Sequence, residues 1–133
     1  MRLYLWIMAG GALGSAGRFF LSGWAADRFG QTFPWGTLLV NVLGSFAIGF
    51  FGALTDPAEG RLFVGSTARQ FFMAGVCGGF TTFSSFSLQT LALARDGEWL
   101  HAGGNVLGSV SICLLSVWFG FAAAMWFNHW KGA

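Results

Sequence analysis

The chain has 133 residues, of which 55% are hydrophobic and only 9% are charged, and its formal net charge is +2. An ordinary soluble domain carries about 25% charged residues, and a chain of this length cannot bury so much apolar surface in one core. This composition excludes a soluble protein, and it excludes a nucleic-acid-binding one because no run of basic residues exceeds one.

The gaps between charged residues predict four membrane-spanning helices, at residues 3–26, 33–55, 70–94 and 99–128. Each stretch supplies the roughly 20 residues that a spanning helix needs. The connections are too short to hold a soluble domain. We therefore expect residues 1–133 to form one all-α, four-helix domain in the lipid bilayer, as a multi-pass protein of the plasma membrane, which is the inner membrane of a bacterium.

Arg18 is the only formal charge inside a predicted span. It lies about 22 Å along the first helix from Leu3, below one interface rather than at the middle of the bilayer. Two roles are open: an arginine that snorkels to anchor the helix, or a positive vestibule that draws anions toward a pore. In the same span Gly10 and Gly14 are four residues apart, a spacing that allows close helix packing within the chain or between subunits.

Asn41 is the polar residue near the middle of the second span. An amide at that depth destabilises the protein if it has no partner, so it must face another helix or a ligand. Interhelical hydrogen bonding explains it, and so does donation to an anion that has lost its water.

The third span carries Gly-Gly-Phe-Thr-Thr-Phe-Ser-Ser-Phe at residues 78–86, within a stretch that has no charge. Broken backbone inside a membrane is tolerated only where protein or a water-filled path surrounds it. We predict a break at Gly78 and Gly79, because glycine permits distorted backbone and carbonyls turned out of a helix suit a hard monovalent cation.

Phe83 and Phe86 are three residues apart and share one face of the third helix. Core packing is the ordinary explanation for such a pair. An aromatic ring has a positive edge, however, so the two rings and neighbouring hydroxyls could together hold a small, hard anion. The interleaved hydroxyls belong to Thr81, Thr82, Ser84, Ser85 and Ser87.

The fourth span carries a polar residue at every fourth position. These hydroxyls could bond back to their own helix, or the polar face could line a narrow ion path. The series runs His101, Asn105, Ser109 and Cys113, and Ser116 continues it.

No Asp or Glu lies inside any predicted span. Proton-coupled transporters usually hold an intramembrane carboxylate, and small multidrug-resistance exporters, which match this chain in length and span number, are expected to need a glutamate in the first span. No phosphate-binding loop or enzyme constellation occurs either. A passive path for an anion, not an enzyme, fits best; a cation exporter and a non-conducting scaffold are the alternatives.

Three segments together resemble the CrcB/Fluc family of fluoride channels. They are the run from Gly10 to Arg18, GTLLVNVLG at 36–44 and GGFTTFSSFS at 78–87, and the resemblance covers essentially the whole chain. It implies a fluoride-selective channel that lets fluoride leave the cell down its gradient and so protects against fluoride toxicity. It also implies an antiparallel, dual-topology homodimer with two pores between its subunits.

The resemblance further implies roles for individual residues. A structural sodium ion on the dimer axis is expected to be bound by backbone carbonyls of Gly78 and Thr81, and Arg18 is expected at the vestibule. The expected fluoride pore comprises Asn41, Thr82, Phe83, Ser84, Phe86, Asn105 and Ser109.

This chain departs from the family pattern at three positions. The family commonly has a glutamate where the chain has Gln89. The polar face of its fourth span often begins with tyrosine, here Asn105, and continues through serines, here Ser109 and Cys113.

Overall fold

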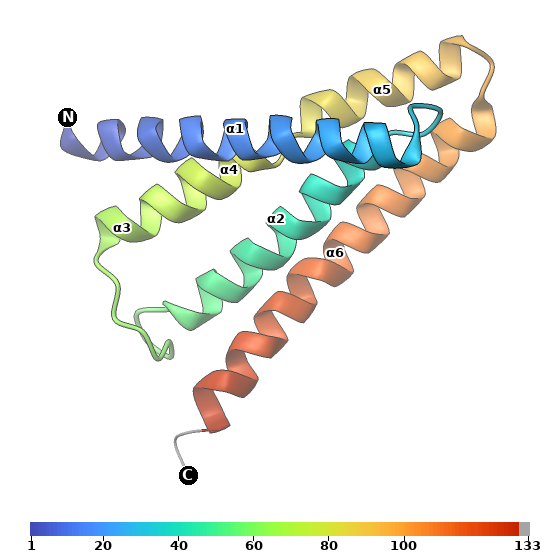
Figure 1. Cartoon of the computed structure of the whole chain (residues 1–133). Coiled ribbons are helices and arrows are strands. Elements are labelled where there is room, and N and C mark those ends of the chain that lie inside the picture. The colour runs from blue at the N-terminus through green and yellow to red at the C-terminus, as the bar shows by residue number, and fades with distance from the viewer. Residues whose placement is uncertain (131–133) are drawn as a thin grey trace.

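The computed structural model describes residues 1–130, and within that range every regular element is a helix and there is no strand. Residues 1–130 form four long helical segments, and Figure 1 shows how they are arranged. They are α1 (Arg2–Phe29), α2 (Trp35–Leu54), a broken third segment from Ser66 to Arg95, and α6 (Trp99–Trp130). The expected all-α fold is confirmed. A helix satisfies its own backbone hydrogen bonds, as a lipid environment requires.

The third segment contains four short elements in succession. Between the last two, Thr81 and Thr82 adopt extended backbone, with φ and ψ of −86° and 157° at Thr81 and −152° and 115° at Thr82. The break was predicted at Gly78 and Gly79, but both glycines remain helical and the break begins three residues after Gly78. The elements are α3 (Ser66–Gln70), the π-helix η1 (Phe71–Cys77), α4 (Gly78–Phe80) and α5 (Phe83–Arg95).

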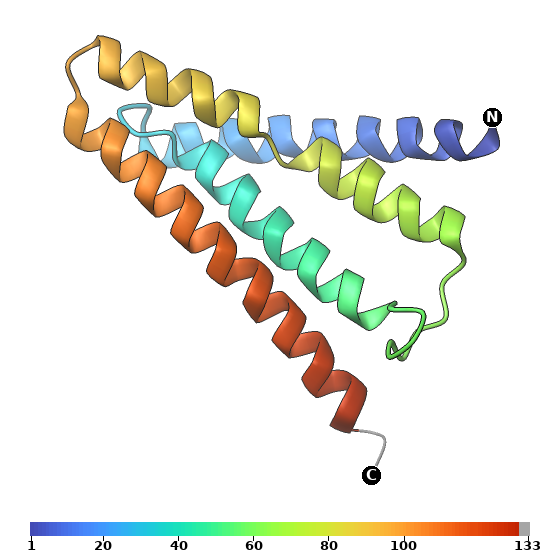
Figure 2. The same cartoon turned by 180° about the vertical axis from the view of Figure 1, so that it is seen from behind.

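Helices α2 and α6 run side by side, and the reverse view in Figure 2 shows the same pairing. Helix α1 crosses at an angle and packs mainly on η1, α4 and α2. The crossing depends on glycine: a Cβ atom at Gly10 or Gly14 would collide with backbone of η1 and α4. This pair therefore serves packing within the chain. Gly104 and Gly108 of α6 instead face open space.

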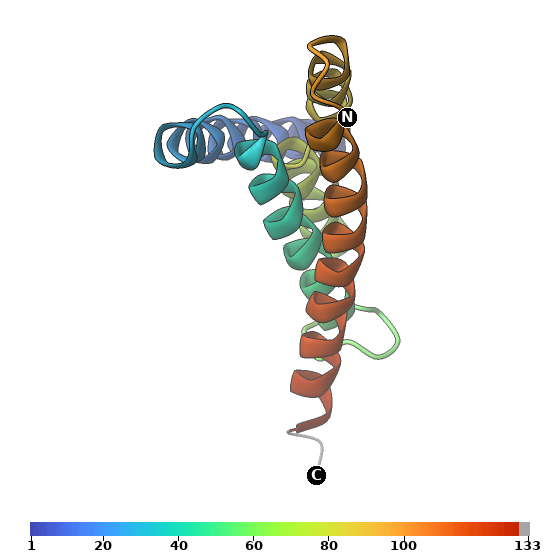
Figure 3. The same ribbon diagram turned by 90° about the vertical axis from the view of Figure 1, so that its right-hand side faces the viewer.

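Three of the helical segments are long and apolar enough to cross a membrane: α2, Ser66–Arg95 and α6. Helix α1 is the fourth long helix. It ends where Gly30 takes a φ of 82° and donates its N–H to the Ala26 carbonyl. A second glycine with positive φ, Gly97, lies in the turn between α5 and α6. Figure 3 shows the connection between α2 and α3 projecting to one side of the α2–α6 pair.

Candidate functional site

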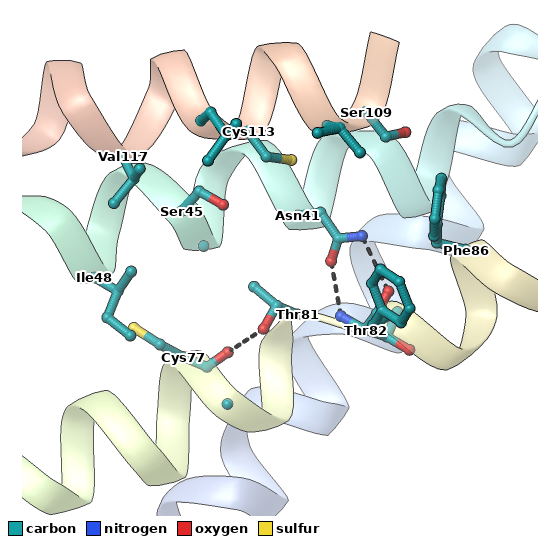
Figure 4. Close-up of a pocket in the computed structure, with 15 residues that line it drawn as sticks. Asn41, Ser45, Ile48, Cys77, Thr81, Thr82, Phe86, Ser109, Cys113 and Val117 are labelled. Carbon is teal, nitrogen blue, oxygen red and sulfur yellow. Dashed lines mark hydrogen bonds between the residues drawn. The ribbon is translucent and has the colours of Figure 1, made fainter. Parts of the chain in front are cut away.

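Asn41 of α2 reaches across to the break in the third segment (Figure 4) and makes two hydrogen bonds to Thr82. Its Nδ2 donates to the Thr82 carbonyl oxygen at 3.0 Å, and its Oδ1 accepts from the Thr82 backbone N–H at 2.7 Å. In a continuous α-helix that N–H would donate to the Gly78 carbonyl. The amide of α2 thus replaces a lost helical bond, which lets backbone polar groups remain paired inside an apolar region.

Thr82 begins the helix that follows the break. Its Oγ1 accepts from the Ser85 backbone N–H at 3.2 Å, the usual contact of an N-cap threonine, and also lies 3.1 Å from Ser85 Oγ and 3.2 Å from Ser84 Oγ. The Thr81 hydroxyl donates to the Cys77 carbonyl at 2.9 Å. Both threonine hydroxyls therefore support the backbone at the break, while the Ser84 side chain is exposed.

A hollow of about 440 Å³ lies between α2, the break and α6. Its wall is mostly apolar and contains no charged side chain; amide, hydroxyl and thiol groups supply its polar atoms. Seven residues that the sequence predicted for the ion path or the cation line this hollow. They are Asn41, Gly78, Thr81, Thr82, Phe83, Phe86 and Ser109.

The two predicted phenylalanines lie together in the structure. The ring centroids of Phe83 and Phe86 are 5.3 Å apart, and the ring planes are tilted by 47°. Phe86 is 8% exposed and packs within the chain, whereas Phe83 is 76% exposed. The shared face expected from their spacing is confirmed, with one ring packed inside the subunit and the other on its surface.

The polar series on α6 forms an interhelical seam. Asn105 is only 1% exposed; its Nδ2 donates to Thr90 Oγ1 at 2.8 Å, and its Oδ1 accepts from Ser109 Oγ at 3.1 Å. Thr90 Oγ1 donates in turn to the Phe86 carbonyl at 2.7 Å. Ser109 lines the hollow and Asn105 does not, so Asn105 connects the hollow wall to α5 instead of facing the space itself.

The neighbouring members of that series also have defined contacts. The Ser116 hydroxyl donates to the Val42 carbonyl of α2 at 2.7 Å, a bond between helices and not back to its own helix. At the other end, His101 Nδ1 lies 2.9 Å from a carboxylate oxygen of Glu98, and both side chains are exposed. His101 is thus placed at the beginning of α6, outside the hollow.

Arg18, which was expected at the vestibule, and Gln89, which departs from the family pattern, both lie outside the hollow. Arg18 is partly exposed on α1 and does not line the hollow. Gln89 lines a second space, of about 400 Å³, between α1, the connection that follows it and α5. The Oε1 atom of Gln89 is buried and has no hydrogen-bond partner among residues 1–130.

Ser45, Cys77 and Cys113 also line the hollow, although none of them was among the expected pore residues. A signal for Ser45 was present, because it follows Asn41 by four residues and such residues share a helix face. Cys113 was on the polar series of α6 already. Nothing in the local sequence of Cys77 indicates its exposure to this space.

The break also provides atoms that could bind a cation. Carbonyl oxygens suit hard monovalent cations, and the carbonyls of Gly78 and Thr81 have both lost their helical N–H partners, one to Asn41 and one to Thr82. Within residues 1–130 no group of three or more His, Cys, Asp or Glu side chains could bind a metal. The donor set at the break therefore fits sodium better than it fits zinc or a divalent cation that needs carboxylates.

Comparison with known proteins gives a consistent family assignment. The family described as CrcB-like protein, Camphor Resistance (CrcB), matches residues 5–121. The fluoride-specific ion channel FluC of Opitutus terrae is 65% identical over 133 residues, which is all of both chains. Proteins of the same name from Methylocella silvestris and Rhodospirillum rubrum are 62% and 57% identical, over 98% and 95% of this chain and 98% and 97% of theirs.

Proposed function

The chain belongs to the CrcB family of fluoride-specific ion channels, and we propose that it conducts fluoride through the hollow beside Asn41. The observation that carries this proposal is the composition of the hollow wall, where an amide, hydroxyls and two phenylalanine rings face a space without charged side chains. Such a wall can replace the hydration shell of a small anion without binding it too tightly to leave. Because no Asp or Glu lies in the predicted spans, conduction is passive and not coupled to protons.

Asn41 and the phenylalanine pair act on the anion in different ways. Asn41 uses one amide hydrogen for the Thr82 carbonyl, and its NH₂ group has a second hydrogen to donate. The rings of Phe83 and Phe86 offer positive edges along the same wall. The Ser109 hydroxyl lines the same wall and donates its one hydrogen to Asn105 Oδ1, so in this arrangement it positions the wall and does not donate to the anion. The seam behind the wall would therefore hold the pore groups in fixed positions.

The hollow of one subunit is open, and we propose that a second copy closes it. The large exposed fraction of Phe83 and the unoccupied faces of Gly104 and Gly108 support a tight contact between subunits. Helix α1 would serve as the fourth spanning helix. The basic residues differ little between the two membrane sides, which supports insertion in both orientations. One side carries Arg2, Arg61, Arg69 and Lys131, and the other carries Arg28 and Arg95, with Arg18 as a third if it snorkels to that side.

In an antiparallel homodimer each membrane face would carry one Arg18. Its charge would raise the local concentration of fluoride at a vestibule, which does not require that it touch the hollow of its own subunit. The carbonyls of Gly78 and Thr81 would bind sodium where the two broken segments meet. That ion would supply positive charge to neutralise carbonyl dipoles that converge at the axis.

The physiological role follows from the chemistry of a weak acid. Hydrogen fluoride crosses membranes as a neutral molecule and dissociates inside the cell, where the anion is trapped. A passive fluoride pore in the bacterial inner membrane would release that anion down its electrochemical gradient. The protein would thereby confer fluoride resistance.

Fluoride release from liposomes tests this function directly. Purified protein is reconstituted into vesicles loaded with potassium fluoride, a potassium ionophore starts the flux, and an electrode records external fluoride. We expect release far above that of protein-free vesicles, and no comparable release from vesicles loaded with chloride. Equal fluxes of the two anions would refute selectivity. Proton-coupled uptake of an organic cation without fluoride release would instead favour the exporter alternative.

Orientation in the membrane is tested by labelling single cysteines in intact cells. One cysteine is introduced near Trp130 and another near Arg95, in separate variants that lack Cys77 and Cys113. Antiparallel assembly requires about half of each population to be labelled from outside. Labelling of every copy at one site and none at the other would refute it and favour a parallel oligomer.

A further inference from the structure

We infer that Asn41 and the Thr82 hydroxyl are positioning residues of the cation site at the break. Each side chain accepts a hydrogen bond from a backbone N–H that would donate to a carbonyl of the third segment in a continuous helix. The carbonyls of Gly78 and Thr81 therefore lose their helical donors and are free to bind sodium. This inference rests on the sodium site proposed above. It assigns Asn41 a second task that is separate from donation to fluoride.

The Gly78 carbonyl is freed by Asn41. An α-helix that continued through the threonines would pair this carbonyl with the Thr82 N–H, four residues later. That N–H lies instead 2.7 Å from Asn41 Oδ1, and the Asn41 Nδ2 holds the Thr82 carbonyl at 3.0 Å. The two bonds fix the peptide groups on both sides of Thr82, so the N–H cannot turn back toward Gly78 while Asn41 is in place.

The Thr81 carbonyl is freed by the next residue. Its helical partner would be the Ser85 N–H, which donates instead to Thr82 Oγ1 at 3.2 Å. Thr82 is 7% exposed, so this capping bond is shielded from water. The Asn41 amide of α2 and the hydroxyl of Thr82, the N-cap residue of α5, thus each free one of the two carbonyls that the cation would use.

Other backbone groups at the break have substitute partners. The Gly79 carbonyl accepts from Ser15 Oγ of α1 at 3.4 Å, and the Thr81 N–H and hydroxyl both donate to the Cys77 carbonyl. The structure supplies no such substitute donor to Gly78 or Thr81 from residues 1–130. Gly78 is exposed and Thr81 is half-buried in the single subunit, so both carbonyls are open to a further ligand. Carbonyl oxygens without a donor suit a hard cation, which a second subunit would enclose.

The same amide therefore contributes to two sites. Asn41 lines the hollow and also holds the backbone that presents the cation ligands. Replacement of Asn41 by alanine removes both functions. Replacement by aspartate removes the donor and places a negative charge at the pore, but it keeps an oxygen that can accept from the Thr82 N–H.

The test measures sodium-dependent thermal stability of purified protein in detergent, because a bound cation stabilises the folded state by mass action. Sodium is raised at constant ionic strength by replacing N-methyl-D-glucamine. We expect the unfolding temperature of wild type to rise with sodium, and this rise to be lost in Asn41→Ala and reduced in Thr82→Val. Ser116→Ala is the matched control, since it removes another bond to α2, at Val42, without touching the break.

The outcomes separate the proposed sodium site from the positioning role of Asn41 and the Thr82 hydroxyl. If wild type shows no sodium-dependent rise, the sodium site is wrong and this inference is overturned with it. If wild type responds and both Asn41→Ala and Thr82→Val respond equally, the sodium site stands and the positioning role is overturned. Should Asn41→Ala not fold, Thr82→Val decides: an undiminished rise overturns the inference and a reduced one supports it. Ser116→Ala must keep the full rise; its loss would mean that general destabilisation explains the result, which also overturns the inference.

Discussion

Replacement of the two phenylalanines by isoleucine separates a role in conduction from a role in packing. Phe83→Ile changes a ring that is 76% exposed, whereas Phe86→Ile changes one that is 8% exposed. Isoleucine is a large apolar side chain that still fills part of the site, but it has no aromatic ring and so no positive ring edge. We expect both variants to lose fluoride flux, while only Phe86→Ile weakens the fold of the subunit.

The expected losses of stability and of fluoride flux follow from the environments of the two rings. A well-tolerated apolar exchange in a core costs less than about 1.5 kcal/mol, so Phe86→Ile should lower stability by about 1 kcal/mol, and Phe83→Ile should leave the single subunit nearly unchanged. A hydrogen bond to a charged group contributes about 1.5–3 kcal/mol. If a ring edge stabilises dehydrated fluoride by a similar amount at the barrier, its loss slows flux about 10- to 150-fold.

The assay combines fluoride release from proteoliposomes with size-exclusion chromatography, which reports the oligomeric state. Phe20→Ile is the matched control, because Phe20 is 74% exposed and does not line the hollow. Its flux should equal that of wild type. Wild-type flux in both Phe83→Ile and Phe86→Ile would refute a pore lined by ring edges, and loss of the oligomer in either would attribute the effect to assembly.

Three further results are expected. Asn41→Asp should abolish fluoride release, because a negative charge replaces a donor on the pore wall; full flux would leave Asn41 with a structural role only. Gly14→Ala should destabilise the protein by about 1–3 kcal/mol, since a Cβ atom there collides with backbone of η1 and α4, while Gly23→Ala on the same helix meets open space and should not lower the unfolding temperature; equal effects would contradict the α1 crossing. Asp56 accepts backbone N–H bonds from Ala58 and Glu59, which hold its pKa below the ordinary value. Its contribution to stability is therefore present at neutral pH and lost as the pH falls through that lowered pKa, so the difference in unfolding temperature between wild type and Asp56→Ala should narrow in acid. A difference independent of pH would contradict this.

Several features of the molecule depend on spacing along the chain and could be predicted without its structure. Uncharged stretches long enough to cross a bilayer predicted the helical segments, since lipid leaves a chain few alternatives to helix. The i, i+3 spacing of Phe83 and Phe86 placed their rings together, and the rings are 5.3 Å apart. The mid-span amide of Asn41 had to find a partner, because an unpaired one is costly.

The position of the break depends on a contact between distant parts of the chain. The glycine pair suggested a break at Gly78, but glycine is compatible with helix and only permits a distortion. The distortion occurs at Thr81 and Thr82 because Asn41, 41 residues before Thr82, binds both backbone groups of Thr82. No local pattern in the third segment contains that information.

The rotation of each helix about its axis was likewise decided by packing. Asn105 and Ser109 belong to one polar series on α6, yet only Ser109 lines the hollow, because Thr90 of α5 binds Asn105 and buries it. Arg18 is away from the hollow of its own chain. The sequence by itself determined which segments are helical and which polar groups need partners, since both depend on local spacing and on the solvent. Tertiary structure decided which partner each group found, because that depends on how neighbouring helices cross.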